Sequence, residues 1–266
     1  MVSRLDNRNE DCIPLGIASS VAYTYGYSWQ KTLELAKKLN LSVIQLHINQ
    51  FEPDFNLQLN TETFDQLYVH LNSEFNYSHP FITNIGKYSR LQALIQHEKY
   101  IKDGDINFLS RHHLPLALEN DNGEKINGFI TKLESLMRSE LDLHVVIDYT
   151  RFVHQFHNRY SLNDIFEHVV DILNLCKVQN IPVLLHTIDI SSFDPHSSNW
   201  LPIFEGLVSW DKLFSFVIES SIPVKAVIFE YEDFSNTEKS VYSLREWFKK
   251  MSYARKGECD FSNSNT

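Results

Sequence analysis

Residues 143–149 read LHVVIDY, and residues 181–187 read IPVLLHT. Both runs are apolar, and neither shows the strict alternation of polar and apolar residues that marks a half-buried strand. They fit parallel strands that are buried on both faces. Between them, residues 162–176 place apolar side chains at helical spacing. A strand, a helix and a second strand in this order form the unit from which α/β folds with a parallel sheet are built.

The same alternation runs along the whole chain. It predicts strands at Ile13–Ser19, Ser42–Ile48, Phe75–Phe81, Leu91–His97, Leu114–Glu119, Leu143–Tyr149, Ile181–Thr187 and Lys225–Tyr231. It predicts helices at Trp29–Leu39, Thr61–Leu71, Asn127–Met137, Leu162–Cys176, Trp210–Ile218 and Leu244–Met251, with a shorter one within Asp105–His112. His70 falls on the second of these helices and is expected at a surface or an interface.

Eight strands that alternate with helices over about 250 residues are typical of a TIM barrel. We therefore predict an α/β fold, a single (βα)8 TIM-barrel domain over residues 1–254, followed by a polar, flexible tail at 255–266. A doubly wound open sheet is the main alternative. That fold usually carries a glycine-rich turn after its first strand, whereas residues 19–23 read SSVAY and contain no GxGxxG motif.

The composition limits which kinds of binding partner, such as nucleic acid or a membrane, are expected. The chain has 266 residues, and its 24 Lys and Arg against 34 Asp and Glu give a net charge of −10. This excludes nucleic-acid binding through a general basic surface, because counterion release needs clustered cations. No apolar run reaches the roughly 20 residues that span a membrane, and the first residues lack the apolar stretch of a secretion signal. We expect a cytoplasmic protein without membrane contacts, and a homo-oligomer stays open.

Acidic and histidine side chains end six successive predicted strands, and TIM-barrel active sites lie at these ends. In chain order they are His79, His97, Glu119, Asp148, His186 and Glu230. Imidazole nitrogens and carboxylate oxygens without thiolates suit Zn²⁺, Mn²⁺, Fe²⁺, Co²⁺ or Mg²⁺. We expect Glu119, Asp148, His186 and Glu230 to hold one divalent ion with positions left open for substrate. The alternative is that these side chains cap strands or pair with basic residues.

The segments around these four residues resemble the xylose isomerase-like barrels. The segments are LALEN at 116–120, VVID at 145–148, VLLH at 183–186 and VIFE at 227–230. In addition, LPIFEGLVSW at 201–210 is similar to the GEG-hydrophobic-x-W passage before the seventh helix of that superfamily. The superfamily includes small sugar isomerases and epimerases as well as the endonuclease IV group.

The resemblance implies a divalent-metal-dependent isomerase or epimerase of a small carbohydrate, either a sugar or a sugar phosphate. In such an enzyme Glu119 and Glu230 are both metal ligands and the acid/base pair. One abstracts a proton next to the substrate carbonyl and the other returns it. Tyr25, Trp29 and Trp200 follow strands and are candidate walls of a sugar pocket. Arg151 is a candidate for binding a phosphate or a carboxylate of the substrate.

The endonuclease IV branch implies an alternative function, metal-dependent cleavage of abasic or damaged DNA. His79 and His97 resemble the two histidines that complete its first metal site, and Asp194-Pro195-His196 resembles the Asp-x-His pair of a third ion. That branch has a histidine three residues after the strand-six aspartate, where this chain has Arg151. A guanidinium does not ligate cations, and the acidic net charge also weighs against DNA. A non-catalytic barrel that binds a small molecule is the third possibility.

Overall fold

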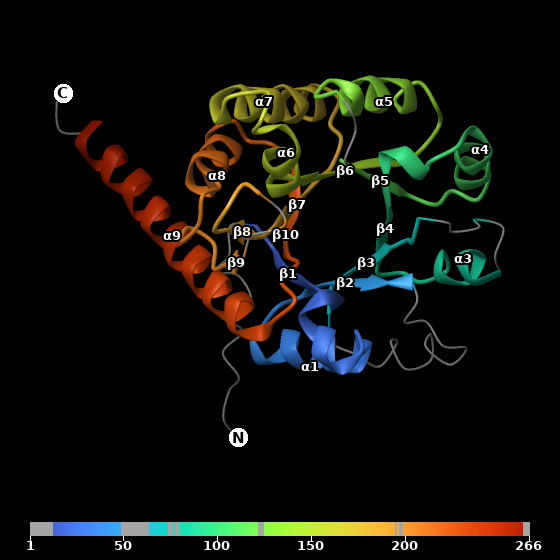
Figure 1. The fold of residues 1–266 in the computed structure, drawn as a ribbon, viewed down its shortest axis with the longest axis horizontal. Helices are drawn as coiled ribbons and strands as arrows, with labels where there is room; N and C mark the ends of the chain where they lie inside the picture. The colour runs from blue at the N-terminus through green and yellow to red at the C-terminus, as the bar shows by residue number, and fades with distance from the viewer. Residues whose placement is uncertain are drawn as a thin grey trace.

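The computed structural model describes residues 13–48, 64–73, 77, 80–121, 125–194, 196 and 199–262. Its centre is a closed barrel of eight parallel strands in the order β1–β10–β7–β6–β5–β4–β3–β2 (Figure 1). These strands are β1 (Leu15–Ala18), β2 (Val43–His47), β3 (Gln66–His70), β4 (Leu91–His97), β5 (Leu116–Glu119), β6 (Leu143–Asp148), β7 (Val183–Thr187) and β10 (Val224–Phe229). The predicted (βα)8 TIM barrel is confirmed.

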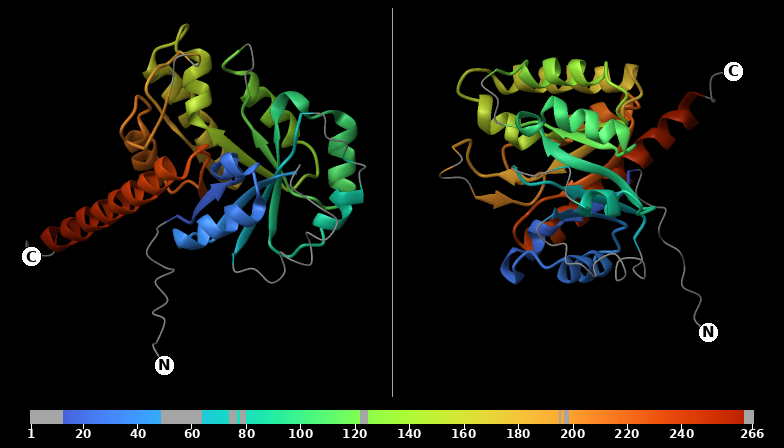
Figure 2. Two further views of the ribbon diagram at one scale, coloured as in Figure 1. Left: turned by 60° about the horizontal axis from the view of Figure 1, so that its bottom comes forward. Right: turned by 90° about the vertical axis from the view of Figure 1, so that its right-hand side faces the viewer.

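Helices surround this barrel and connect its strands (Figure 1). They are α1 (Trp29–Lys38), α3 (Pro80–Ile85), α4 (Asp103–Arg111), α5 (Gly128–Leu136), α6 (Tyr149–Phe156), α7 (Leu162–Val178), α8 (Trp210–Glu219) and α9 (Phe234–Ser262), with 3-10 turns η1 (Ser19–Tyr25) and η3 (Glu98–Tyr100). The far end of α9 projects past the barrel wall (Figure 2). The division of the chain at residue 254 stays a prediction. Among the described residues, no helix has both the length and the apolar composition to cross a membrane.

Two apolar clusters hold the barrel together. One consists only of strand residues and fills the barrel interior: Ala18, Val43, Tyr68, Ala93, Ile95, Ala117, Val146, Leu184, Ala226 and Ile228. The other contains outward side chains of the strands together with side chains of the helices, for example Val145 of β6 and Ile165 of α7. Because both faces of each strand are buried, the strands read as continuous apolar runs.

The third strand was predicted at the wrong place. The structure forms β3 at Gln66–His70, within the predicted helix Thr61–Leu71, and α3 at Pro80–Ile85 overlaps the predicted strand Phe75–Phe81. Phe64, Leu67 and Leu71 fit helical spacing, yet a short run buried on both faces gives the same signal. Pairing decides between them, because Val69 lies opposite both Leu46 of β2 and Leu94 of β4.

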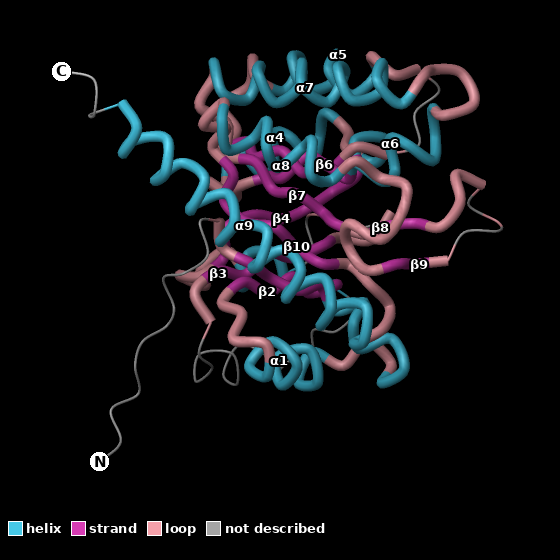
Figure 3. The backbone as a smooth tube through the Cα atoms, turned by 90° about the vertical axis from the view of Figure 1, so that its left-hand side faces the viewer, coloured by secondary structure: helices cyan, strands magenta, loops and turns pink. Residues whose placement is uncertain are grey.

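A two-stranded hairpin, β8 (Asp189–Ile190) with β9 (Trp200–Leu201), lies between β7 and α8 and so interrupts the seventh βα unit. It lies outside the barrel wall, at the same end as α6 (Figure 3). The buried Asp189 carboxylate accepts the N–H groups of Ile190, Gly206 and Val208 at 2.9, 3.0 and 3.1 Å. The Trp210 indole donates to the Ile188 carbonyl at 3.1 Å. These bonds tie Gly206, Val208 and Trp210 of LPIFEGLVSW to the segment that follows β7.

Gly206 is expected to tolerate no side chain. A Cβ there would overlap the Asp189 carboxylate and lie 2.6 Å from the Ile190 carbonyl oxygen. We expect Gly206→Ala to lower the free energy of unfolding by about 1–3 kcal/mol. The matched control is Gly104→Ala in α4, where a Cβ meets nothing within 4 Å and stability should hold or rise by up to about 1 kcal/mol. Equal changes in urea unfolding of the two variants would contradict this account.

Candidate metal centre

Five potential ligands lie at or next to the ends of barrel strands. His70, His97 and Glu119 are the last residues of β3, β4 and β5, His186 lies near the end of β7, and Glu230 follows β10. Parallel strands end at one rim of a barrel, so these side chains meet there. Glu119 and His186 are 0% and 1% exposed, which means that they form the floor of this centre.

Glu119, His186 and Glu230 form the first group of potential ligands. One ligand atom from each lies within 4.8 Å of the others. His186 Nδ1 is 3.2 Å from Glu119 Oε1 and 3.2 Å from Glu230 Oε2. Imidazole and carboxylate ligands of this kind fit a divalent ion such as Zn²⁺, Mn²⁺, Fe²⁺ or Co²⁺.

Gln45 of β2 orients two members of this group. Its Nε2 donates to Glu230 Oε1 at 2.6 Å, and its Oε1 accepts a hydrogen bond from His186 Nε2 at 2.8 Å. In neutral His186 the unprotonated Nδ1 therefore faces two carboxylates, and none of these three converging atoms can donate to the others. Such an arrangement needs a proton or a metal ion at its centre.

Without a metal ion, a proton takes this place. Burial lowers the pKa of His186, but the carboxylates of Glu230 and Glu119 outweigh burial and raise it to about 10. Burial likewise raises the pKa of Glu230, yet His186 outweighs it and lowers that pKa to about 2. The chemistry of the donor set thus fits a resident cation at this position.

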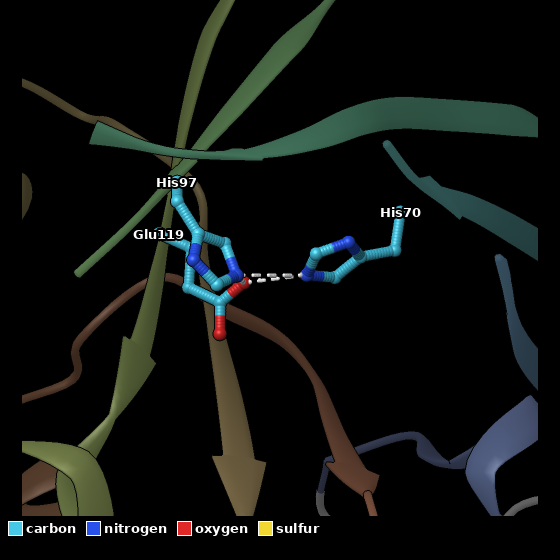
Figure 4. A group of neighbouring side chains, drawn as sticks. All are labelled: His70, His97 and Glu119. Carbon is cyan, nitrogen blue, oxygen red and sulfur yellow. Dashed lines mark hydrogen bonds and ion pairs between the residues drawn. The ribbon is translucent and has the colours of Figure 1, made fainter. Parts of the chain in front are cut away.

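His70, His97 and Glu119 form the second group, which shares Glu119 with the first. Both imidazoles point toward the Glu119 carboxylate (Figure 4). His70 Nε2 and His97 Nε2 lie 2.9 and 3.2 Å from Glu119 Oε2 and 3.2 Å from each other. His70 Nδ1 donates to the Leu71 carbonyl, and His97 Nδ1 pairs with Asp121 at 2.9 Å. The Nε2 atoms of both histidines thus face the shared carboxylate.

Asp148 belongs to neither group among the described residues and pairs with Arg151 instead. Asp148 Oδ1 accepts the backbone N–H of Arg151 at 2.8 Å, which caps α6, and Asp148 Oδ2 lies 3.1 Å from Arg151 Nε. Arg151 Nη1 is also 3.0 Å from Glu119 Oε1. Burial raises the pKa of Glu119, but Arg151, followed by His186 and His97, lowers it well below its ordinary value. Of the four predicted ligands, the structure gathers Glu119, His186 and Glu230 and pairs Asp148 with arginine.

A cavity of about 550 Å³ opens beside these residues. Its lining includes Asp148, Arg151, Trp200 and Glu230. Two of the predicted substrate contacts, Arg151 and Trp200, thus line this cavity. Tyr25 is 60% exposed, with Lys31 Nζ 5.0 Å from its ring centre.

Other predicted site residues lie elsewhere. Trp29 belongs to the hydrophobic core, because α1 turns its first residue inward. Asp194 and His196 are exposed in the segment between β8 and β9, where the Asp194 carboxylate accepts the His196 N–H at 3.0 Å. Neither belongs to the two ligand groups of the described residues. His79 lies outside the described residues.

Three residues of the centre escaped prediction: Gln45, His47 and His70. The expected surface position of His70 is wrong, because His70 ends a barrel strand and is 8% exposed. His47 lies opposite His70 in the β2–β3 register, with ring centres 4.8 Å apart. Burial, followed by the charge of His70, lowers the pKa of His47 to about 4. A correctly placed third strand would have indicated His70.

Replacing Gln45 should weaken metal binding without changing any ligand. Gln45→Leu removes the bonds that orient His186 and Glu230, and loss of such supporting bonds typically costs about 10–100-fold in affinity. Calorimetric titration with Zn²⁺ measures the effect. The control is Gln96→Leu on β4, whose amide bonds the Asn72 carbonyl and the His97 N–H instead. Equal affinities in the two variants would argue against this role of Gln45.

Comparison with known proteins finds similar solved structures but no similar sequence family. No family model and no curated protein sequence matches the chain. Among solved structures, the probable 3-DHS dehydratase AsbF of Bacillus anthracis matches with a TM-score of 0.56 and 13% identity, over 90% of this chain and 99% of that one. The IOLI protein with a bound zinc atom matches with a TM-score of 0.57 and 11% identity, over 90% and 96%.

A sugar phosphate isomerase/epimerase of Parabacteroides distasonis matches with a TM-score of 0.50 and 13% identity, over 88% of this chain and 93% of that one. Identities this low show similarity of fold alone. The chain shares the (βα)8-barrel fold of these structures.

Proposed function

We propose that the chain is a divalent-metal-dependent isomerase or epimerase of a small sugar or sugar phosphate. The observation that carries the proposal is the convergence of Glu119, His186 and Glu230, whose acceptor atoms face one another in a buried floor. These three residues would hold the ion. When bound, such an ion stabilises negative charge that develops on a substrate oxygen.

The two glutamates are the proposed acid/base pair. Glu230 lines the cavity, and its side chain is 14% exposed, so it can reach a substrate carbon. It is ionised at neutral pH, as its lowered pKa requires, and accepts the proton next to the substrate carbonyl. Glu119 lies deeper and is the second member of the proposed pair; because its pKa is lowered, it must first take up a proton before it returns one on the opposite side.

Arg151 and Trp200 are the proposed substrate contacts in the cavity wall. The Arg151 side chain is 23% exposed and lines the cavity, so its guanidinium is accessible to a phosphate or carboxylate oxygen. The Trp200 indole offers an apolar face to a sugar ring. The cavity volume of about 550 Å³ lies in the range of small-molecule sites.

The names of two similar structures support this choice, one being a sugar phosphate isomerase/epimerase and one holding zinc. The direct test loads the protein with Mn²⁺, Co²⁺ or Zn²⁺ and incubates it with ketoses, aldoses and sugar phosphates in D₂O. We expect deuterium to enter at the carbon next to the carbonyl, as measured by NMR. If sugars bind but none of them takes up deuterium, the result would favour the non-catalytic barrel.

Endonuclease activity is the second candidate, and the group of His70, His97 and Glu119 favours it because it offers ligands for another ion. Against it stand the net charge of −10 and the exposed positions of Asp194 and His196. A duplex with one synthetic abasic site tests this candidate. Metal-dependent cleavage of that duplex, without exchange in any sugar, would replace the isomerase proposal.

A further inference from the structure

We infer that the Arg151 guanidinium is a built-in cation that takes the place of a second metal ion and limits the centre to one. The inference rests on the proposed function, because it concerns how the same centre binds metal. It begins with Glu119, which belongs to both groups of potential ligands. Full occupancy of both groups would require this one carboxylate to serve two divalent ions.

Arg151 lies at the junction of the two groups. Its Nη1 is 3.0 Å from Glu119 Oε1, and the same nitrogen is 3.4 Å from His97 Nε2. Nη1 also donates to the Asn120 carbonyl at 3.1 Å, which holds the guanidinium in place. A permanent positive charge therefore sits beside atoms that a second ion would need, and like charges at this range repel strongly in a buried site.

Arg151 also withdraws a ligand from the centre. Asp148 and His186 are paired residues in the β6–β7 register, so their backbones are neighbours. Both oxygens of Asp148 nevertheless contact Arg151, one at its backbone N–H and one at Nε. The carboxylate that could complete a larger ligand set is thereby bound to an arginine.

Charge balance gives an independent argument. The groups joined by ion pairs include four carboxylates, those of Glu119, Glu230, Asp148 and Asp121, and two cations, Arg151 and Lys99. With neutral histidines their net charge is −2, because two positive charges offset two of the four negative ones. One divalent ion neutralises this cluster, whereas two would leave a buried excess of positive charge.

The test compares metal stoichiometry in four proteins by calorimetric titration with Zn²⁺ and by elemental analysis after gel filtration. We expect one ion per chain in the wild type and in Arg151→Lys, which keeps the charge. We expect Arg151→Gln to bind two ions, or one ion at least tenfold more tightly. The control Arg245→Gln removes the same charge at the opposite end of the barrel, where Arg245 bonds the Leu39 and Asn40 carbonyls, and it should bind like the wild type.

Thermal unfolding separates this role from a merely structural one. Arg151→Gln should unfold at a lower temperature than wild type without metal, yet gain more from added Zn²⁺. If it folds only with Zn²⁺ present, it can be refolded with the metal before elemental analysis. Two ions in the wild type, or unchanged stoichiometry and affinity in Arg151→Gln, would overturn the inference and leave the proposed function standing. No ion in any of the four proteins would overturn both.

Discussion

Glu119→Gln should lower the free energy of unfolding by about 3 kcal/mol, the largest loss of stability that we expect from any single change in the centre. Glu119 is fully buried, and its two oxygens contact His70, His97, His186 and Arg151. The glutamine keeps the shape of the side chain but not its charge. It leaves cationic partners in a buried site without their main counter-charge.

Urea unfolding of the metal-free protein measures this loss. The control is Glu34→Gln, which removes a carboxylate whose side chain is 66% exposed and which pairs with Lys31 at 2.7 Å. Exposed ion pairs contribute about 0–1 kcal/mol, so this variant should unfold much like the wild type. If Glu119→Gln were as stable as Glu34→Gln, Glu119 could not be the electrostatic hub of the centre.

Glu230→Gln should lower the rate of proton exchange by about 10³-fold while the protein stays folded. General acid–base catalysis typically contributes about 10²–10⁴-fold, and an amide cannot accept the proton. Glu230 is the proposed base because it lines the cavity and also contacts His186 at 3.2 Å. The measurement is deuterium incorporation into the best substrate at saturating metal, so that weakened metal binding does not mimic the loss.

The neighbouring carboxylate Glu232 supplies the control for this experiment. It is exposed and lies two residues further along the chain. Glu232→Gln should exchange protons at the wild-type rate. Full activity in Glu230→Gln would remove the acid/base assignment, whatever the metal content of that variant.

Much of the barrel could be predicted because most strands are apolar runs bounded by polar segments. The predicted strand 143–149 matches β6 within one residue, and its pairing with β7 follows from their order in the chain. The prediction of the third strand was wrong because its apolar residues fit both helical spacing and a buried strand. Only its pairing with both neighbouring strands shows that it is a strand. Helix α6 escaped prediction because its start is fixed by an aspartate that seemed to belong to the site alone.

The candidate site was predictable where it depends on strand ends. Glu119, His186 and Glu230 were identified in this way, since parallel strands bring their ends together. The pairing of Asp148 with Arg151 was not, because it depends on side-chain conformation rather than on position along the chain. The role of Gln45 could not be predicted from the sequence. A single polar residue inside an apolar strand indicates a function only when its neighbours across the barrel are known.

The carboxylate of Glu119 belongs to two ligand groups at once, and this gives the centre a thermodynamic consequence. A ligand that binds at the His186 side polarises the Glu119 carboxylate, which is also a potential ligand on the His70 side. The two sides are therefore coupled, and by linkage each must alter the affinity of the other by the same factor. An ion and a substrate group that bind on opposite sides of Glu119 would therefore weaken each other's binding through this carboxylate, without direct contact.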